Sequence, residues 1–127
     1  MEALILDASV LIGLLDTADA HHERSLDDVE AADREGRHLL LPASAYSETL
    51  VAFARAGRLA EARQAIAAMG ITVMSLTDTI AERAAELRAN YERLRLPDAI
   101  VLASALEERG ELLSYDRRLT RLAGKPR

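Results

Sequence analysis

The sequence contains no cysteine and no tryptophan, and its aromatic residues are limited to three Tyr and one Phe. The absence of cysteine excludes disulfides, thiolate zinc sites and cysteine nucleophiles. A stacking platform for nucleic-acid bases is disfavoured by so few aromatics, although Tyr115 could stack on a base. No apolar run approaches the roughly 18 residues of a membrane span, and the N-terminus lacks a signal-peptide pattern. We therefore expect a cytoplasmic protein that does not bind a membrane.

Lysine is also scarce, since fifteen of the 16 basic residues are Arg, and the formal net charge is -5. This negative charge excludes a general nucleic-acid coat protein, which would be basic. It is compatible with a nuclease whose acidic residues hold metal ions. The 127 residues, half of them hydrophobic and 29% charged, fit a single globular domain over residues 1–127 with one core.

Short apolar runs alternate with segments of helical periodicity along the chain. The apolar runs predict strands at residues 3–6, 38–42, 71–75 and 111–115. The periodic segments predict helices at residues 8–15, 22–35, 44–56, 58–69, 77–95, 97–106 and 117–123. Strands joined by helical crossovers imply a parallel sheet with helices on both faces. We expect a three-layer α/β/α fold around a central parallel sheet of four to five strands.

Five of the six glycines follow helix-like segments. We interpret these five as helix stops in the left-handed conformation, which glycine adopts without strain. They are Gly36, Gly57, Gly70, Gly110 and Gly124.

Asp7 and Asp116 share one context in the sequence. Each follows a predicted buried strand and precedes a predicted helix. The carboxyl ends of parallel strands lie on one edge of a sheet, so the two side chains can converge there if their strands are neighbours. For Asp7 alone, a simple role as helix N-cap is an equally good interpretation.

Two further acids precede or follow apolar segments in a similar way. Asp98 stands at the start of a helix that is apolar nearly all round, where the helix dipole favours a negative charge and where capping alone is the other explanation. Glu48 lies one turn into the helix predicted over residues 44–56, on a stripe otherwise made of alanines. A surface glutamate is the commoner case for any single Glu. Four such positions together favour a functional site.

Four carboxylates at one edge require a counter-charge. Two like charges ~4 Å apart repel by about 4 kcal/mol at an effective dielectric near 20. All-oxygen ligands without His or Cys select a hard cation, Mg2+ or Mn2+. The matching chemistry is metal-assisted phosphodiester hydrolysis, with one or two ions.

Four motifs resemble, in order and spacing, those of PIN-domain ribonucleases, and most closely the VapC toxins of bacterial toxin-antitoxin pairs. They are LDASVLI at 6–12, SETL at 47–50, LPDAI at 96–100 and SYDRRL at 114–119. The resemblance implies that the catalytic, metal-binding acids are Asp7, Glu48, Asp98 and Asp116. It also implies an endoribonuclease that arrests growth, an antitoxin partner that feeds a basic segment into the acidic groove, and a homodimer.

The same resemblance implies that the hydroxyls of Ser9 and Ser114 orient a carboxylate or a metal-bound water. The chain departs from the pattern after Asp116, where many relatives carry another acid and this chain has Arg117 and Arg118. The short fifth strand usual in the family has no clear counterpart here. We expect the antitoxin to dock on the amphipathic helices within residues 44–69 and 77–94.

Basic residues gather after Asp116 and before Asp98. The C-terminal group comprises Arg117, Arg118, Arg121, Lys125 and Arg127. These cations suit RNA phosphates, and a solvated tail near a helix end explains them equally well. The same two interpretations apply to Arg88, Arg93 and Arg95. His21 and His22, near Asp19 and Glu23, could suggest a metal site. Adjacent helical residues point about 100° apart, so we interpret them instead as a plain exposed helix start.

Two other functional classes also begin with an acid after the first strand. A phosphotransfer enzyme of the haloacid-dehalogenase kind needs a second acid two residues later, where this chain has Ser9. A receiver-like signalling module needs a late Lys and a phosphoacceptor Asp after a middle strand. The only Lys is Lys125, and the second and third predicted strands end in no Asp.

Overall fold

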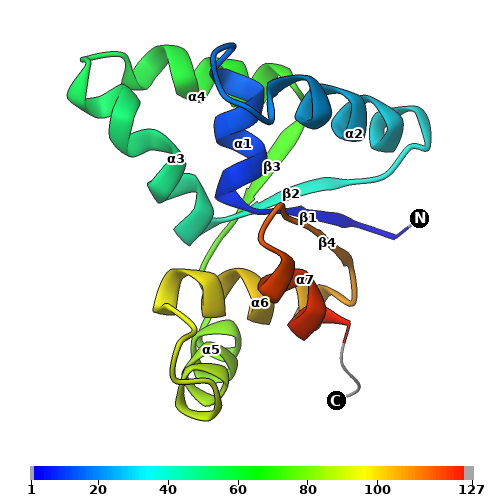
Figure 1. Ribbon diagram of the computed structural model, residues 1–127, viewed down its shortest axis with the longest axis vertical. Coiled ribbons are helices and arrows are strands. Elements are labelled where there is room, and N and C mark those ends of the chain that lie inside the picture. The colour runs from blue at the N-terminus through cyan, green and yellow to red at the C-terminus, as the bar shows by residue number, and fades with distance from the viewer. Residues whose placement is uncertain (1, 125–127) are drawn as a thin grey trace.

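A computed structural model describes residues 2–124 of the chain, so Lys125 and Arg127 of the C-terminal basic group lie outside the described residues. The described residues form an alternating α/β arrangement (Figure 1). The strands are β1 (Leu4–Leu6), β2 (Leu39–Pro42), β3 (Ile71–Met74) and β4 (Glu111–Leu113). The helices are α1 (Ala8–Leu15), α2 (His22–Arg34), α3 (Ala43–Arg55), α4 (Leu59–Ala68), α5 (Asp78–Asn90), α6 (Leu96–Glu108) and α7 (Arg117–Ala123).

The four strands pair in the order β3-β2-β1-β4, and every pairing is parallel. This confirms the predicted parallel sheet. Strand β1 is fully buried between β2 and β4, with Leu4 opposite Leu39 and Leu6 opposite Leu113. Because β1 and β4 are neighbours in register, the residues that follow them start from the same edge of the sheet.

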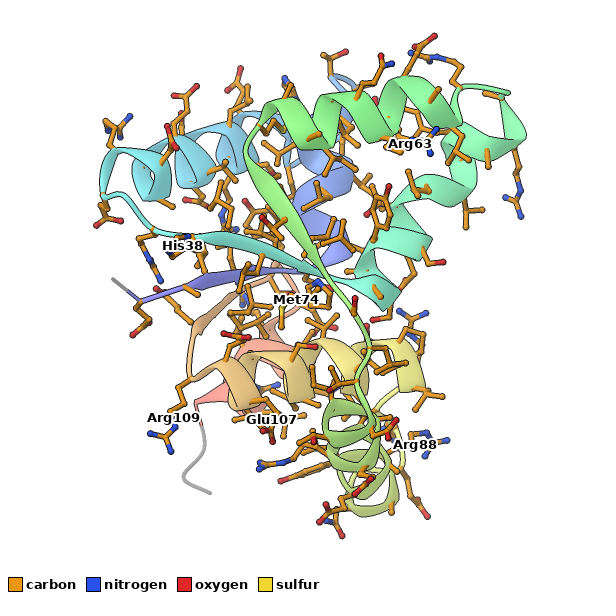
Figure 2. All side chains as sticks on the ribbon, turned by 180° about the vertical axis from the view of Figure 1, so that it is seen from behind. His38, Arg63, Met74, Arg88, Glu107 and Arg109 are labelled. Atoms are coloured by element: carbon orange, nitrogen blue, oxygen red, sulfur yellow. The ribbon has the colours of Figure 1, made fainter. Side chains whose placement is uncertain are left out.

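The helices form one layer on each face of the sheet. Figure 1 shows α1 to α4 on one side and α5, α6 and α7 on the other, with the strands between them. In the view from behind, β3 runs at the edge of the sheet toward α5, with Met74 on it (Figure 2). The sheet buries Ile5, Leu6 and Leu41 completely, and this core confirms the predicted three-layer fold. No helix within residues 2–124 is long and apolar enough to cross a bilayer.

Helix α5 is shorter than the sequence pattern predicts. We expected helix up to Arg95, whereas α5 ends at Asn90 and Leu94 reaches the core from a loop. The proline ring of Pro97 would clash with the carbonyl of Arg93 if helix ran through both. Arg95 instead adopts an extended conformation and α6 begins directly after it.

The glycine prediction is right at three positions and wrong at two. Gly36, Gly57 and Gly70 have positive φ, as expected. After α6, however, Arg109 takes the left-handed conformation (φ 53°), and Gly124 has φ -82°. Gly110 serves a different purpose, because a Cβ there would collide with Ile5 and with the backbone of Ala3.

The start of α2 packs against α1, which corrects the expectation of an exposed helix start. The Nδ1–H of His22 donates to the Gly13 carbonyl at 2.7 Å. The ring of His21 packs on that of Tyr115, with centroids 4.6 Å apart. Gly13 allows this approach, because a Cβ on it would meet Ser25 of α2 at less than contact distance.

We predict that Gly13→Ala destabilises the protein by roughly 1–3 kcal/mol, the usual cost of overpacking. A Gly→Ala change inside an unconstrained helix would instead stabilise it by ~1 kcal/mol. Chemical denaturation measures the difference. The double variant Gly13→Ala/Ser25→Ala removes the closest atom on α2 and should recover part of the loss. Increased stability of Gly13→Ala alone would contradict the close approach of α1 and α2.

Candidate active site

Asp7 lies at the carboxyl end of the central strand β1. Its Oδ1 accepts the backbone N–H of Ala8 at 2.8 Å, so it caps α1. Its Oδ2 accepts the Ser114 hydroxyl, from the end of β4, at 2.7 Å. The residue is only 6% exposed. Asp7 is therefore a helix cap and also a carboxylate fixed in orientation by hydrogen bonds from the start of α1 and from the turn after β4.

The turn after β4 is held by two serine hydroxyls. Ser114 donates to Asp7 and accepts the backbone N–H of Asp116 at 3.1 Å. The Ser9 hydroxyl accepts the N–H of Tyr115 at 3.3 Å and thereby joins α1 to this turn. Asp116 is exposed, and its Oδ1 caps α7 through the N–H groups of Arg118 and Leu119. The two serines thus connect the turn that carries Asp116 to Asp7 and to α1.

Asp98 and Glu48 come together through an arginine. The Arg95 guanidinium donates to both oxygens of Asp98, at 3.1 and 3.3 Å, and to Glu48 Oε2 at 3.4 Å. The Ser44 hydroxyl donates to the Pro97 carbonyl at 3.0 Å, which ties the start of α3 to the start of α6. The second oxygen, Glu48 Oε1, is buried and has no hydrogen-bond partner within residues 2–124.

The charges of this group interact. Burial raises the pKa of Asp7, the nearby charges of Asp98 and Asp116 raise it further, and the hydrogen bonds from Ser114 and Ala8 oppose the rise. The hydrogen bond and charge of Asp98, followed by the charge of Glu48, raise the pKa of Arg95. The edge therefore carries more negative charge than its single guanidinium neutralises.

The donor set fits a hard divalent cation. It is made of carboxylate oxygens and hydroxyls, the ligands that Mg2+ and Mn2+ prefer, and Glu48 Oε1 is a buried acceptor without a partner in the described chain. As these side chains lie in residues 2–124, no three acidic or His side chains are close enough to bind one ion together. Arg95 instead holds the position between Glu48 and Asp98.

The structure shows where the arginines of α7 and the side chain of Tyr115 lie. Arg117 and Arg121 are exposed on α7, and Arg118 reaches back to donate to the Arg93 carbonyl at 2.9 Å. The Tyr115 ring is packed by His21 and lies 4.3 Å from the guanidinium carbon of Arg24. Its hydroxyl donates to Asp28 at 2.9 Å. Both the ring and the hydroxyl of Tyr115 therefore contact other residues of the protein.

Sequence reasoning missed the bridging role of Arg95 and the tie made by Ser44. One signal for Arg95 was present: it stands three residues before Asp98, a spacing at which opposite charges pair on a helix. Nothing in the sequence indicates that Arg95 contacts Glu48, which is 47 positions away. The distance along the chain conceals this contact.

The profile of the PIN domain matches residues 4–125, and the chain belongs to this family. Among solved structures, the chain is similar to one in a toxin-antitoxin complex from Klebsiella pneumoniae, at 25% identity and a TM-score of 0.72, covering 98% of this chain and 93% of that one. Among curated proteins, no sequence matches significantly.

Two more solved structures share the fold at lower identity. VapC20 of Mycobacterium tuberculosis, described as a sarcin-ricin loop cleaving toxin, is 18% identical with a TM-score of 0.74, covering 98% of this chain and 97% of that one. VapBC2 from Rickettsia felis, bound to a DNA fragment from its promoter, is 10% identical with a TM-score of 0.75, covering 94% and 92%.

We predict that Asp7→Asn has a higher Tm than the wild type at pH 7 in EDTA. Because its pKa is raised on folding, Asp7 binds a proton more tightly in the folded state, so its ionisation lowers the free energy of unfolding as pH rises above the ordinary value of 3.8. Neutral Asn removes this cost. The gain should disappear toward pH 4, where the wild-type carboxyl takes up its proton.

Asp116→Asn is the matched control, because it makes the same change at an exposed helix cap. It should leave Tm unchanged or slightly lower. A lower Tm for Asp7→Asn at every pH would contradict the stated balance of burial and charge at Asp7.

We predict that Arg95→Ala loses about 1 kcal/mol of stability in EDTA, the upper end for a partly exposed ion pair. It leaves Asp98, whose side chain is 11% exposed, without its counter-charge. Added Mn2+ should stabilise the variant more than the wild type, because a cation then replaces the guanidinium. Thermal unfolding with and without Mn2+ measures both effects.

Arg58→Ala provides the control, since Arg58 pairs with Glu61 at the same i,i+3 spacing but with both side chains exposed. It should change stability little and should not respond to Mn2+. Equal responses of the two variants would show that Arg95 does not occupy a cation position.

Proposed function

We propose that this single domain is a divalent-metal-dependent endoribonuclease and the toxin of a toxin-antitoxin pair. The observation that carries the proposal is the buried Asp7, held at the carboxyl edge of the sheet with Asp98 and Asp116 near enough to raise its pKa. Membership of the PIN family and the similarity to toxin-antitoxin structures support it.

The chain's own residues divide the work at this edge. Asp7, Asp98, Asp116 and Glu48 would hold Mg2+ or Mn2+. The ion supplies activation of water and stabilisation of the leaving oxygen in phosphodiester hydrolysis. Ser114 keeps one Asp7 oxygen in a fixed direction, and Ser9 fixes the turn that carries Asp116. Arg117, Arg118 and Arg121 belong to α7, which begins directly after Asp116, and they would contact RNA phosphates.

A groove between α1 and α3 suits the antitoxin. It has a volume of about 480 Å³, and its lining includes Ile12, Leu15, Phe53 and, at the acidic edge, Glu48. Ile12 is 37% exposed, a large apolar side chain without full cover. An apolar antitoxin segment would bury this groove, and a following Arg would reach the carboxylates, where its planar fork pairs bidentately. We also propose that two copies of the chain form a dimer.

Neither alternative class gains support. Ser9 makes a hydrogen bond to the Tyr115 backbone where a haloacid-dehalogenase-like enzyme needs its second acid. A receiver-like module needs a late Lys, and Lys125, the only Lys of the chain, lies outside the described residues.

The activity is tested with purified protein and cellular RNA in Mg2+ or Mn2+. Asp7→Asn and Asp98→Asn keep the side-chain size but remove a charge and a metal ligand, so cleavage should fall by orders of magnitude while the fold persists. Glu61→Gln, an exposed acid on α4, is the matched control and should cleave normally. Undiminished cleavage by the wild type in excess chelator would contradict the metal mechanism.

Toxicity is tested in growing bacteria. Expression of the chain alone should arrest growth, the Asp7→Asn form should not, and co-expression with a small neighbouring gene should restore growth and yield a co-purifying complex. Equal arrest by the Asp7→Asn form would separate toxicity from the proposed chemistry.

A further inference from the structure

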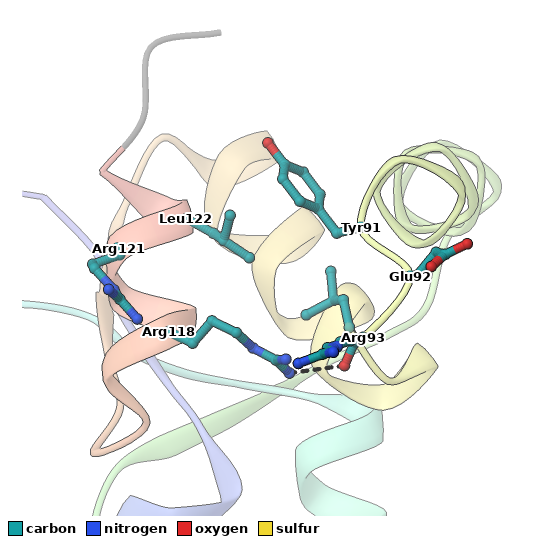
Figure 3. Close-up of a pocket in the computed structure, with 7 residues that line it drawn as sticks. Tyr91, Glu92, Arg93, Arg118, Arg121 and Leu122 are labelled. Atoms are coloured by element: carbon teal, nitrogen blue, oxygen red, sulfur yellow. Dashed lines mark hydrogen bonds between the residues drawn. The ribbon is translucent and has the colours of Figure 1, made fainter.

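A pocket outside the acidic group opens between α7 and the loop that joins α5 to α6. Its volume is about 420 Å³, within the roughly 300–1,000 Å³ of typical ligand pockets. It is lined by Tyr91, Glu92, Arg93, Leu94, Arg118, Arg121 and Leu122. Figure 3 shows the Tyr91 ring and Leu122 on opposite sides of the space, with Arg118 across one end. The pocket thus combines an apolar interior with a basic rim.

The pocket is continuous in sequence with the acidic group on two sides. Arg118 follows Asp116 by two residues, and its backbone N–H donates to the Asp116 carboxylate. Its guanidinium crosses to the Arg93 carbonyl, and this hydrogen bond joins α7 to the loop (Figure 3). In the loop, Leu94 is the last residue that lines the pocket. The next residue is Arg95, which forms ion pairs with Asp98 and Glu48. The two segments that line the pocket are thus the ones that carry Asp98 and Asp116.

The charges around the pocket favour an anion. Within residues 2–124, none of the guanidinium groups of Arg93, Arg118 and Arg121 is in an ion pair with a carboxylate, although the whole chain carries -5. Arg118 uses one of its five donors on the Arg93 carbonyl, which leaves others for a ligand. Glu92, the one acid of the lining, points away from the centre of the space (Figure 3).

We propose that this pocket binds one nucleotide of single-stranded RNA next to the cleaved phosphodiester. The base enters between Tyr91 and Leu122, and its phosphate is held by Arg118 and Arg121. Single-stranded RNA is recognised by unstacked bases that lie on aromatic or guanidinium planes, and both are present here. The inference rests on the proposed ribonuclease function.

Photo-cross-linking tests the position directly. Asp7→Asn protein, in which we expect cleavage to be lost, is irradiated with an RNA that carries 4-thiouridine on either side of the cleavage site mapped with the wild type. Mass spectrometry should find the cross-links in residues 91–94 or 118–122. Cross-links confined to other segments, with the wild type still cleaving this RNA, would overturn the pocket assignment and leave the proposed function intact.

Binding and kinetics give a second readout. Arg121→Ala should weaken RNA binding, raise KM more than it lowers kcat, and reduce the slope of log K against log salt by about 0.7, the value for one lost phosphate contact on a single strand. Arg63→Ala is the matched control, an exposed Arg on α4 in the opposite helical layer (Figure 2). It should change none of these.

Three results would overturn the proposal. Equal effects of Arg121→Ala and Arg63→Ala on RNA binding would show that Arg121 acts only through the overall charge of the protein. Loss of a dimer in Arg121→Ala with unchanged RNA affinity would assign the pocket to self-association. A wild type that neither binds nor cleaves RNA would overturn the pocket proposal and the proposed function together.

Discussion

Repulsion between carboxylates at one edge of the sheet is the constraint that the rest of the site satisfies. Asp98 and Asp116 lie near enough to Asp7 for their charges to raise its pKa. The chain offsets this in three ways: hydrogen bonds from Ser114 and Ala8 to Asp7, the cap that Asp116 forms on α7, and the guanidinium of Arg95 between Asp98 and Glu48. The pKa of Asp7 is still raised, mainly because the carboxyl is buried and in smaller part because of the charges of Asp98 and Asp116.

Much of the fold could be predicted from short-range pattern. Apolar runs between segments of helical periodicity predicted the four strands. The central strand β1 is buried throughout, as expected of a parallel strand covered on both faces, whereas the edge strands β3 and β4 carry the exposed residues Thr72 and Glu111. The juxtaposition of Asp7 with the β4 turn needed one further fact, that β1 and β4 are neighbours, and Leu6 does pair with Leu113. The roles assigned to the four acids came from family resemblance and remain proposals.

The features that escaped prediction depend on contacts between distant segments or on competing local chemistry. The apolar periodicity predicted that α5 continues to Arg95, since Leu94 fits the apolar stripe. The prediction did not take into account that the Pro97 ring clashes with the carbonyl four residues earlier in a helix, and α5 ends at Asn90. The sequence assigned no role to Gly13, because its close contact with Ser25 of α2 depends on how the two helices pack. For Arg95 the sequence left two interpretations open, an RNA-binding cation or a solvated cation near a helix end. Neither included the ion pair with Glu48, because no local pattern indicates that Glu48 lies within reach of Arg95.

The most direct test of the site is a crystal structure of the protein grown or soaked in Mn2+, with anomalous scattering used to locate the ion. We expect an anomalous peak for an Mn2+ ion coordinated by Asp7 and Asp98. We also expect Arg95 to have left its position between Asp98 and Glu48. A crystal at saturating Mn2+ in which Arg95 keeps both ion pairs and no peak lies at these carboxylates would contradict a metal-dependent nuclease site at this edge.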